Sequence, residues 1–334
     1  MKIIVDGFGG DNAPGEILLG CAQAMEELGV DILLVGDKDR LEAAGKELGI
    51  GDKLAKMEIL PAGQMLSMED EPTSVIKDKA DSSMAVGLRA LAEGKGDAFA
   101  SAGNSGALVV GATTLVKRIH GVKRVTFAPI LPKAGGFFML TDGGANVDCR
   151  PEMLVQFGLM GSVYMEKVMG IRNPRVGLCN VGNEAHKGDD LRKQAHALFQ
   201  ECKGINFTGN VEGRELPYDG CDVAVTDGFT GNMMLKLYEG VALALMDQIK
   251  GVLTSGLKNK LAAAMVYSDM KKLKKHMDYN EYGGAPIMGA KKPVLKIHGS
   301  AKAATVKNAL RLTRDYTRSG IIADIAEAVG KKQE

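Results

Sequence analysis

The stretch DAFASAGNSGA, residues 97–107, contains the junction that decides the fold. Its apolar run at 98–100 predicts a buried strand, and residues 108–119 follow with the apolar spacing of a helix. A glycine at such a turn lets a ligand approach the backbone closely, and the free N–H groups of a helix start favour an anion. We therefore expect a parallel-sheet unit that binds an anion at this turn.

The composition is that of a globular protein. The 334 residues, 45% hydrophobic and 25% charged, suffice for one large α/β core or two smaller lobes. The net charge of +1 provides no overall basic field, so a nucleic-acid partner is not expected. The five cysteines are far apart, without a CxxC pair or metal-ligand spacing, which is typical of a reduced cytosolic protein. We expect neither a metal nor another cofactor.

The sequence predicts no export and no membrane span. The apolar part of the first residues, MKIIVD, is far too short for a secretory signal. The richest apolar window, 233–253, carries Lys236, Glu239, Asp247 and Lys250, so it lacks the ~20 apolar residues that a span needs. Any membrane contact would therefore be peripheral.

Short apolar runs alternate with helical patterns in most of the chain. Runs at 3–6, 32–35 and 57–60 are separated by helical segments, which is the rhythm of a mostly parallel sheet sandwiched by helices, as in Rossmann-like α/β folds. The runs 125–131 and 137–140 have no helix between them and predict an antiparallel pair.

The strand-to-helix rhythm resumes from residue 151, which leaves two organisations open. In the first, residues 1–334 form a single α/β unit. In the second, the chain forms two lobes: one contains about 1–150 together with 285–334, and the other contains about 151–284. A long helical pair near 231–277 would belong to the second lobe.

The expected strands end in small or polar clusters. These are DG at 6–7, SAGN at 101–104, DGGAN at 142–146, NVG at 180–182, GN at 209–210, DG at 227–228 and HGS at 298–300. Each cluster alone is explained as a turn. Because the carboxyl ends of parallel strands converge on one edge of a sheet, seven such ends together predict a shared binding cleft.

Several familiar motifs are incomplete. DGFGGD at 6–11 resembles a dinucleotide fingerprint, but Asn12 replaces its third glycine. GNSGA at 103–107 lacks the last glycine of a GxSxG nucleophile elbow, and there is no phosphate loop of the GxxxxGK type. The first motif leaves open a nucleotide-dependent dehydrogenase of related α/β fold, and the second leaves open a serine hydrolase that no other motif supports. A non-enzymatic scaffold at the membrane surface is a further alternative.

Longer motifs are more specific. They are VDGFGGDNAP, DSSM, SAGNSGA, GANVDCRPE, PRVGLCNVGNEAHKG, GNVEGRE, DVAVTDGFTGN, GGAPIMG and KIHGS, between residues 5 and 300. Together they resemble the bacterial phosphate acyltransferase family, the acyl-ACP:phosphate transacylases of phospholipid synthesis. Phe8, Ser105 and Asn183 depart from the usual Met, Thr and Glu of the family pattern, while the neighbouring glycines and asparagines are kept.

The resemblance implies an activity and a fold. The enzyme would convert long-chain acyl-ACP and inorganic phosphate into acyl phosphate and free ACP, and the acyl phosphate would supply glycerol-3-phosphate acylation. The fold would be similar to that of phosphotransacetylase and the isocitrate dehydrogenase-like superfamily, in a homodimer. The anion at the SAGNSGA turn would then be phosphate or acyl phosphate.

This chemistry fits the side chains at the expected strand ends. Phosphate is an anionic nucleophile and a thiolate is a good leaving group, so the site needs oriented donors and positive charge more than a strong base. The candidate phosphate-binding residues are Gly103, Asn104, Ser105, Asn180 and Asn210. The candidate catalytic residues are Lys187, Arg214, Asp227, Asn232 and His298. For Arg214 a surface pair with Glu212 or Glu215 is an alternative, and for Asp227 a helix cap.

The helical pair suggests sites for larger partners. Lys271, Lys272, Lys274 and Lys275 form a basic patch suited to acidic ACP, with a solvated helix face as the alternative. Leu257, Leu261 and Met265, edged by lysines, are expected to insert shallowly into a membrane, with packing within the dimer as the alternative. The apolar repeat at 233, 237, 241, 245 and 249 would pack in the dimer. We thus expect a cytoplasmic protein at the inner face of the cell membrane, near the acyltransferase that uses its product.

Overall fold

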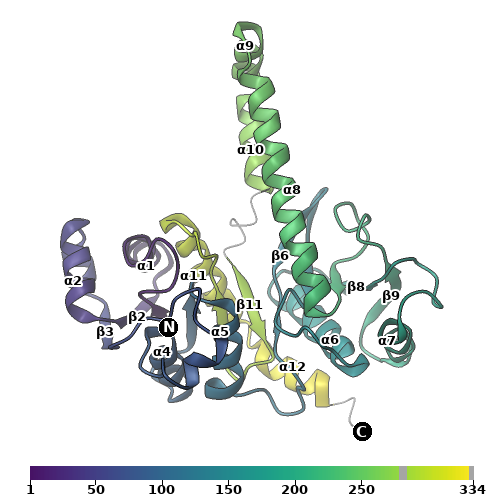
Figure 1. The fold of residues 1–334 in the computed structure, drawn as a ribbon, viewed down its shortest axis with the longest axis horizontal. Coiled ribbons are helices and arrows are strands. Elements are labelled where there is room, and N and C mark those ends of the chain that lie inside the picture. The colour runs from purple at the N-terminus through teal and green to yellow at the C-terminus, as the bar shows by residue number, and fades with distance from the viewer. Residues whose placement is uncertain (278–283, 331–334) are drawn as a thin grey trace.

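The strands form two sheets in the computed structural model, which describes residues 1–277 and 284–330 (Figure 1). The seven-stranded sheet has the order β3-β2-β1-β4-β12-β11-β5, and the five-stranded sheet has the order β6-β7-β10-β8-β9. The first comprises β1 (Lys2–Asp6), β2 (Asp31–Gly36), β3 (Glu58–Pro61), β4 (Ala98–Ser101), β5 (Thr126–Phe127), β11 (Ala285–Met288) and β12 (Val294–Lys296). The second comprises β6 (Ile130–Lys133), β7 (Gly136–Thr141), β8 (Arg175–Cys179), β9 (Asn206–Val211) and β10 (Val223–Val225).

Most neighbouring strands are parallel. β1 pairs in parallel with β2 and β4, β12 with β4, and β10 with both β7 and β8. β6 and β7 are antiparallel, with Ile130 opposite Met139, as the missing helix between them predicts. The α/β fold with mostly parallel sheets is therefore confirmed. The five-stranded sheet begins with β6, before residue 150, and the division into two lobes stays a prediction.

Helices cover both sheets and share one core. They are α1 (Gly15–Leu28), α2 (Lys38–Glu47), α3 (Gly51–Leu54), η1 (Pro72–Ile76), α4 (Ser83–Ala92), α5 (Ser105–Gly111), η2 (Ala112–Val116), α6 (Pro151–Lys167), α7 (Asp190–Glu201), α11 (Ala303–Arg318) and α12 (Ile321–Gly330). The largest apolar cluster contains residues of both sheets. Within it the rings of Tyr164 on α6 and Tyr316 on α11 meet edge to face, with centroids 5.5 Å apart. The two sheets are thus joined by packing.

Three helices form a stalk that projects from the body: α8 (Gly228–Thr254), α9 (Leu257–Met265) and α10 (Tyr267–Met277) (Figure 1). This confirms the long helical pair expected near 231–277. Neither α9 nor α10 contains a buried residue. Among the described residues, even the 27-residue α8 lacks a run apolar enough to span a bilayer.

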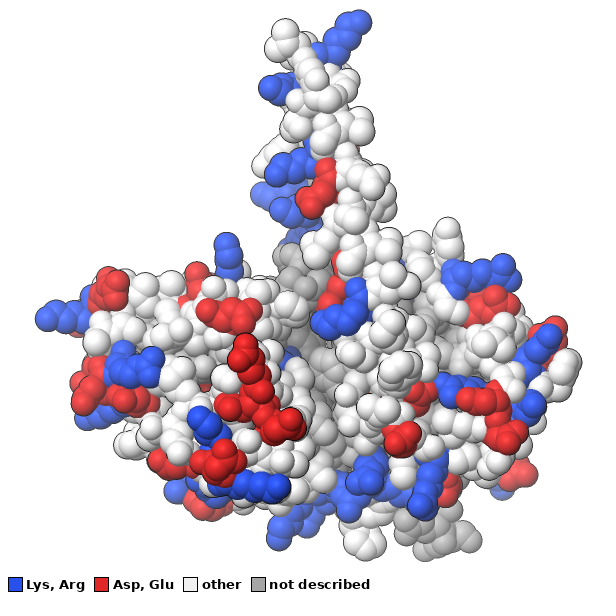
Figure 2. All heavy atoms as spheres, viewed as in Figure 1, with Lys and Arg blue, Asp and Glu red and all other residues white. Residues whose placement is uncertain are grey.

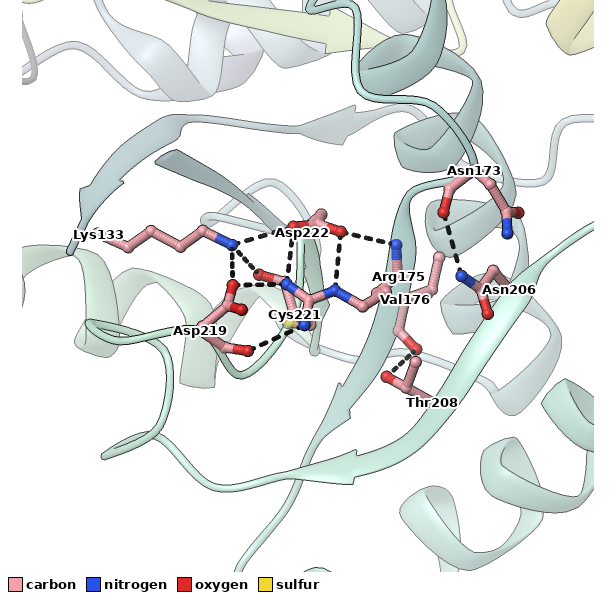
Figure 3. Close-up of polar contacts among 9 residues, drawn as sticks. All are labelled: Lys133, Asn173, Arg175, Val176, Asn206, Thr208, Asp219, Cys221 and Asp222. Atoms are coloured by element: carbon pink, nitrogen blue, oxygen red, sulfur yellow. Dashed lines mark hydrogen bonds and ion pairs between the residues drawn. The ribbon is translucent and has the colours of Figure 1, made fainter. Parts of the chain in front are cut away.

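An ionic network fastens the edge of the five-stranded sheet at which its parallel strands begin (Figure 3). Asp222, directly before β10, accepts hydrogen bonds from Arg175 at 2.9 and 3.1 Å and from Lys133 at 3.0 Å. Asp219 pairs with the same two cations. Burial raises the pKa of Asp222, but the hydrogen bonds from Arg175 and Lys133 outweigh it and lower the pKa to about 2.

Candidate active site

A cavity of about 340 Å³ is lined by residues of both sheets and of α8. One wall comes from the carboxyl ends of the first sheet and includes Asp11, Ser105, Lys296, His298, Gly299 and Ser300. The other includes Gly143, Gly144 and Ala145 after β7, and Asn232, Leu235, Lys236 and Glu239 of α8. Strand ends from both sheets therefore meet at one cleft, and of the seven predicted polar clusters those at 142–146 and 298–300 supply lining residues.

The first wall is held by bonds between the ends of adjacent strands. Asp6, at the end of β1, accepts a hydrogen bond at 2.7 Å from the hydroxyl of Ser101, at the end of β4. That hydroxyl oxygen accepts one from the Gly103 amide at 3.0 Å. The Asp11 amide donates to the Gly299 carbonyl at 2.8 Å, which links the loops after β1 and β12. The three loops thus form one rigid surface.

Asn104 organises the SAGNSGA turn. Its Oδ1 accepts from the Ala107 amide at 3.1 Å and so caps α5, while its Nδ2 donates to carbonyls of the preceding segment, including that of Asp70 at 3.0 Å. Both ends of this buried side chain are engaged within the protein. Ser105, by contrast, is exposed and lines the cavity. The predicted turn is therefore present, with Ser105 as its side chain at the cavity.

Asp142 organises the second wall, and sequence reasoning did not select it. This fully buried carboxylate accepts hydrogen bonds from the amides of Phe127 at 3.0 Å, Ala145 at 3.1 Å and Asn146 at 2.6 Å. Burial raises the pKa of Asp142, although the hydrogen bonds from Ala145 and Asn146 oppose that shift. The sequence feature that could have identified Asp142 is its position as the first residue of DGGAN, directly after an apolar strand.

The start of α8 fits closely against this loop. A Cβ added to Gly231 would lie 1.9 Å from the Asp142 carbonyl oxygen, and one added to Gly228 would lie 2.6 Å from that of Asn146. Only glycine permits the first turn of α8 to lie this close to the loop after β7. The close packing brings Asn232, the next residue of α8, to the cavity.

His298 and Lys296 place nitrogen atoms at the first wall. The Ser300 amide donates to Nδ1 of His298 at 3.3 Å, which puts the proton of a neutral ring on Nε2. Burial lowers the pKa of His298, although Glu239 opposes the shift, so the ring is neutral at pH 7. Sequence reasoning selected His298 and missed Lys296. The feature that could have identified Lys296 is its position as a charged residue within the apolar run VLKIH.

The structure places the remaining predicted residues along the carboxyl edge of the five-stranded sheet, outside the lining of this cavity. Asp227 caps α8 by accepting from the Thr230 amide at 2.9 Å and pairs with Arg192. Hydrogen bonds from Thr230 and the charge of Arg192 outweigh burial and lower the pKa of Asp227. The side-chain Nδ2 of Asn210 donates to the Glu184 carbonyl at 2.9 Å.

Lys187 and Arg214 lie at the surface, outside the lining of the cavity. Lys187 is exposed, and its carbonyl accepts a hydrogen bond at 3.2 Å from Asn180. The side chain of Arg214 is 81% exposed and pairs with Glu212 at 2.9 Å, which is the surface alternative. The site roles of Asn180, Lys187, Asn210, Arg214 and Asp227 stay predictions, whereas Ser105, Asn232 and His298 are brought together.

An apolar groove of about 380 Å³ adjoins the cavity. Leu131 lines both spaces. Beyond it, the groove is lined by Phe138 and Leu140 of β7, by Leu216 and Pro217, and by Met234, Leu237, Tyr238, Val241, Ala242 and Leu245 of α8. The cavity, whose lining combines polar strand-end groups with apolar side chains such as Phe127, Ile130 and Leu235, thus adjoins the apolar groove at Leu131.

Comparisons with known proteins agree with this arrangement. Residues 1–324 match the family model described as "Fatty acid synthesis protein". The chain is 47% identical over 311 residues to a phosphate acyltransferase of Acetivibrio thermocellus, covering 93% of this chain and 91% of that protein. It is 43% identical to a phosphate acyltransferase of Thermoanaerobacterium thermosaccharolyticum, covering 98% and 97%.

A solved structure shares the fold. A phosphotransacetylase from Streptococcus pyogenes superposes with a TM-score of 0.62 at 14% sequence identity, covering 99% of this chain and 94% of that one. The expected similarity to the phosphotransacetylase fold is confirmed. The sequence relatives favour acyl transfer over the dehydrogenase and scaffold alternatives, and the chain belongs to the phosphate acyltransferase family.

Proposed function

We propose that this acyltransferase moves a long-chain acyl group from acyl-ACP to inorganic phosphate and releases acyl phosphate and free ACP. The observation that carries the proposal is the junction at Leu131 between the cavity that bears the polar strand-end groups and the apolar groove. The cavity offers hydrogen-bond donors to phosphate and to the thioester carbonyl, and the groove offers an apolar surface to the acyl chain.

The reaction requires orientation and stabilisation of an oxyanion. A phosphate oxygen attacks the thioester carbonyl carbon, a C–O bond forms, the C–S bond breaks and the sulfur leaves as a thiolate. The conjugate thiol has a pKa of about 8.5, so the leaving group needs little help. Ser105, Asn232 and His298 are the side chains we place against the reactants, since all three line the cavity.

We place ACP on the basic face of α10. Lys271, Lys272, Lys274 and Lys275 lie on this fully unburied helix, and Figure 2 shows mostly basic charged side chains along the stalk. Lys272 also pairs with Asp269 at 3.2 Å, an exposed pair that contributes little. An acidic carrier would be attracted to this surface from a distance.

We place a membrane contact at the tip of the stalk. Leu257, Leu261 and Met265 of α9 are 83%, 70% and 87% exposed, and Lys258 and Lys260 lie beside them. A long-chain acyl phosphate partitions into lipid, so release there would pass it to the glycerol-3-phosphate acyltransferase at the inner face of the cell membrane.

We also propose a homodimer that packs on α8. Met233, Leu237, Val241 and Leu245 are each more than half exposed, at helical spacing on one stripe. A second copy seated on this stripe would cover the open side of the apolar groove and shield a bound acyl chain from water.

The test of the activity uses purified protein with palmitoyl-ACP. Adding inorganic phosphate should release free ACP and form palmitoyl phosphate in equal amounts, and adding sulfate should not. ACP release at the same rate without phosphate would identify a thioesterase and contradict the proposal. The dehydrogenase alternative is tested by adding NADH to the protein and recording its fluorescence. Quenching or energy transfer on binding would support that alternative.

A further inference from the structure

Lys296 is a buried cation in the cavity wall. It is the last residue of β12, opposite Ser101 of β4 in parallel register, and it is only 6% exposed. In the described part of the chain its ammonium donates to two backbone carbonyls, of Ala102 at 3.0 Å and Ile297 at 2.6 Å, and forms no ion pair with a carboxylate. An ammonium has three N–H donors, so one is left over at the cavity.

Charged groups act on Lys296 from a distance, and no carboxylate of the described residues forms an ion pair with it. Asp6 and Asp11, at the end of β1 and in the loop that follows, attract it, whereas Lys236 of α8 repels it. His298 lies two residues further and faces Glu239 and Lys236. Burial lowers the pKa of Lys296 to about 8, although Asp6 and Asp11 oppose the shift. A buried, unpaired ammonium is costly, so an anion that enters the cavity gains a strong partner.

We propose that Lys296 is the residue that binds the phosphoryl oxygens, first of inorganic phosphate and then of acyl phosphate. The inference rests on the proposed function, because it names the phosphate-binding cation of that same cavity. Its two carbonyl bonds fix the ammonium at the SAGNSGA turn, and the third donor is directed to the ligand. Lys296 would thereby hold the nucleophile while the Ser105 and His298 side chains contact the reacting thioester.

Three variants test this assignment. Lys296→Met removes the charge at similar length, Lys296→Arg keeps it, and Lys291→Met removes an exposed lysine of the same segment as a control. Lys296→Met should lower kcat/KM for phosphate by ~10²-fold or more, the scale of losing one oxyanion donor. Lys291→Met should match wild type. Inorganic phosphate alone should raise the Tm of wild type and of Lys291→Met but not of Lys296→Met.

The pH profile supplies a second readout. In wild type, kcat/KM for phosphate should fall as the pH rises through about 8, because the ammonium loses its proton. In Lys296→Arg that fall should disappear, since a guanidinium stays protonated. An unchanged fall in Lys296→Arg would overturn the proposal, and so would phosphate stabilisation of Lys296→Met equal to that of wild type. If wild type releases no ACP when phosphate is added, the proposed function fails. The role of Lys296 is still decided by whether phosphate raises the Tm of wild type but not of Lys296→Met.

Discussion

At the scale of single residues, the site depends on donors that stay in the correct protonation state. His298 is such a donor, because burial lowers its pKa and the Ser300 amide occupies Nδ1. A neutral imidazole can donate Nε2–H to the thioester carbonyl and strengthen that bond as the oxyanion forms.

We expect His298→Ala to lower kcat by ~10²-fold, on the scale of losing one oxyanion donor, with a smaller loss in His298→Gln, which retains a donor. Since burial holds the folded pKa of His298 below its ordinary value of 6.5, wild-type kcat should stay level from pH 8 to 7 and fall only below that ordinary value, where the ring gains a proton. Steady-state rates over this range provide the measurement. A fall that begins near pH 7, or a kcat of His298→Ala equal to wild type, would contradict this role.

Sequence reasoning recovers part of the site at this scale. Ser105, Asn232 and His298 were predicted because each follows a recognisable strand end, and their convergence on one cavity agrees with the parallel topology. Lys296 and Asp142 were missed because their importance arises from burial. A lysine in a short apolar run looks the same whether its ammonium reaches solvent or a cavity.

At the scale of elements, α8 joins the site to the stalk, and its first turn depends on two glycines. Gly231→Ala would bring a methyl group into the Asp142 carbonyl, so we expect α8 to shift, the free energy of unfolding to fall by about 3 kcal/mol and activity to drop. Gly240→Ala is the matched control, because nothing lies within 4 Å of the added Cβ and alanine favours a helix by about 0.5–1 kcal/mol. Urea denaturation measures both. Equal stability of the two variants would show that the contact is unimportant.

The stalk tip is tested by Leu257→Glu/Leu261→Glu. Two carboxylates in place of exposed leucines should abolish co-sedimentation with vesicles that contain anionic lipid, because they remove apolar contact and repel the headgroups. Light scattering checks that the variant has the same mass as wild type. Leu48→Glu/Val181→Glu, at two exposed apolar positions outside the stalk, makes the same change in net charge as a control. If the double variant still sediments as wild type does, the tip is not the membrane contact.

The basic face of α10 is tested by reversing two charges. Lys271→Glu/Lys274→Glu should raise KM for acyl-ACP about tenfold and reduce its salt dependence, since long-range attraction to an acidic carrier is lost while the cavity is untouched. Lys46→Glu/Lys56→Glu makes the same change in net charge at exposed positions far from the stalk. If both double variants have the same KM for acyl-ACP, ACP docks elsewhere.

The alternating rhythm of apolar runs predicted most strands and their parallel pairing, but not β11, which pairs antiparallel with β12 and β5. It did not predict the division of the strands between two sheets. β12 pairs with β4, which precedes it by about 190 residues, and this pairing is fixed by packing rather than by local pattern. The stalk was predictable because α8 has more apolar surface than one core contact needs.

At the scale of the whole molecule, the two edges of the five-stranded sheet serve separate purposes. The carboxyl edge reaches the cavity, whereas the opposite edge is fastened by Asp222 with Arg175 and Lys133 (Figure 3). Asp222→Asn should therefore lower the free energy of unfolding by about 3 kcal/mol at pH 7 and leave kcat unchanged.

The pH dependence of this loss has a definite sign. The folded pKa of Asp222, about 2, lies below its ordinary value of 3.8, so its contribution is complete above about pH 4 and disappears as the pH falls through 2. Thermal unfolding of wild type and Asp222→Asn from pH 7 to 2 should show a stability difference that shrinks on acidification. A loss of kcat with unchanged stability would place this network in the active site instead.

The central claim is that the cavity, through its polar strand-end groups, and the adjoining apolar groove hold the two ends of one product. A crystal structure with palmitoyl phosphate tests it most directly. We expect the phosphoryl group in the cavity beside Lys296 and His298, and the acyl chain passing Leu131 into the groove along α8. A phosphoryl group bound at the exposed Lys187 loop, or an acyl chain outside the groove, would contradict the account.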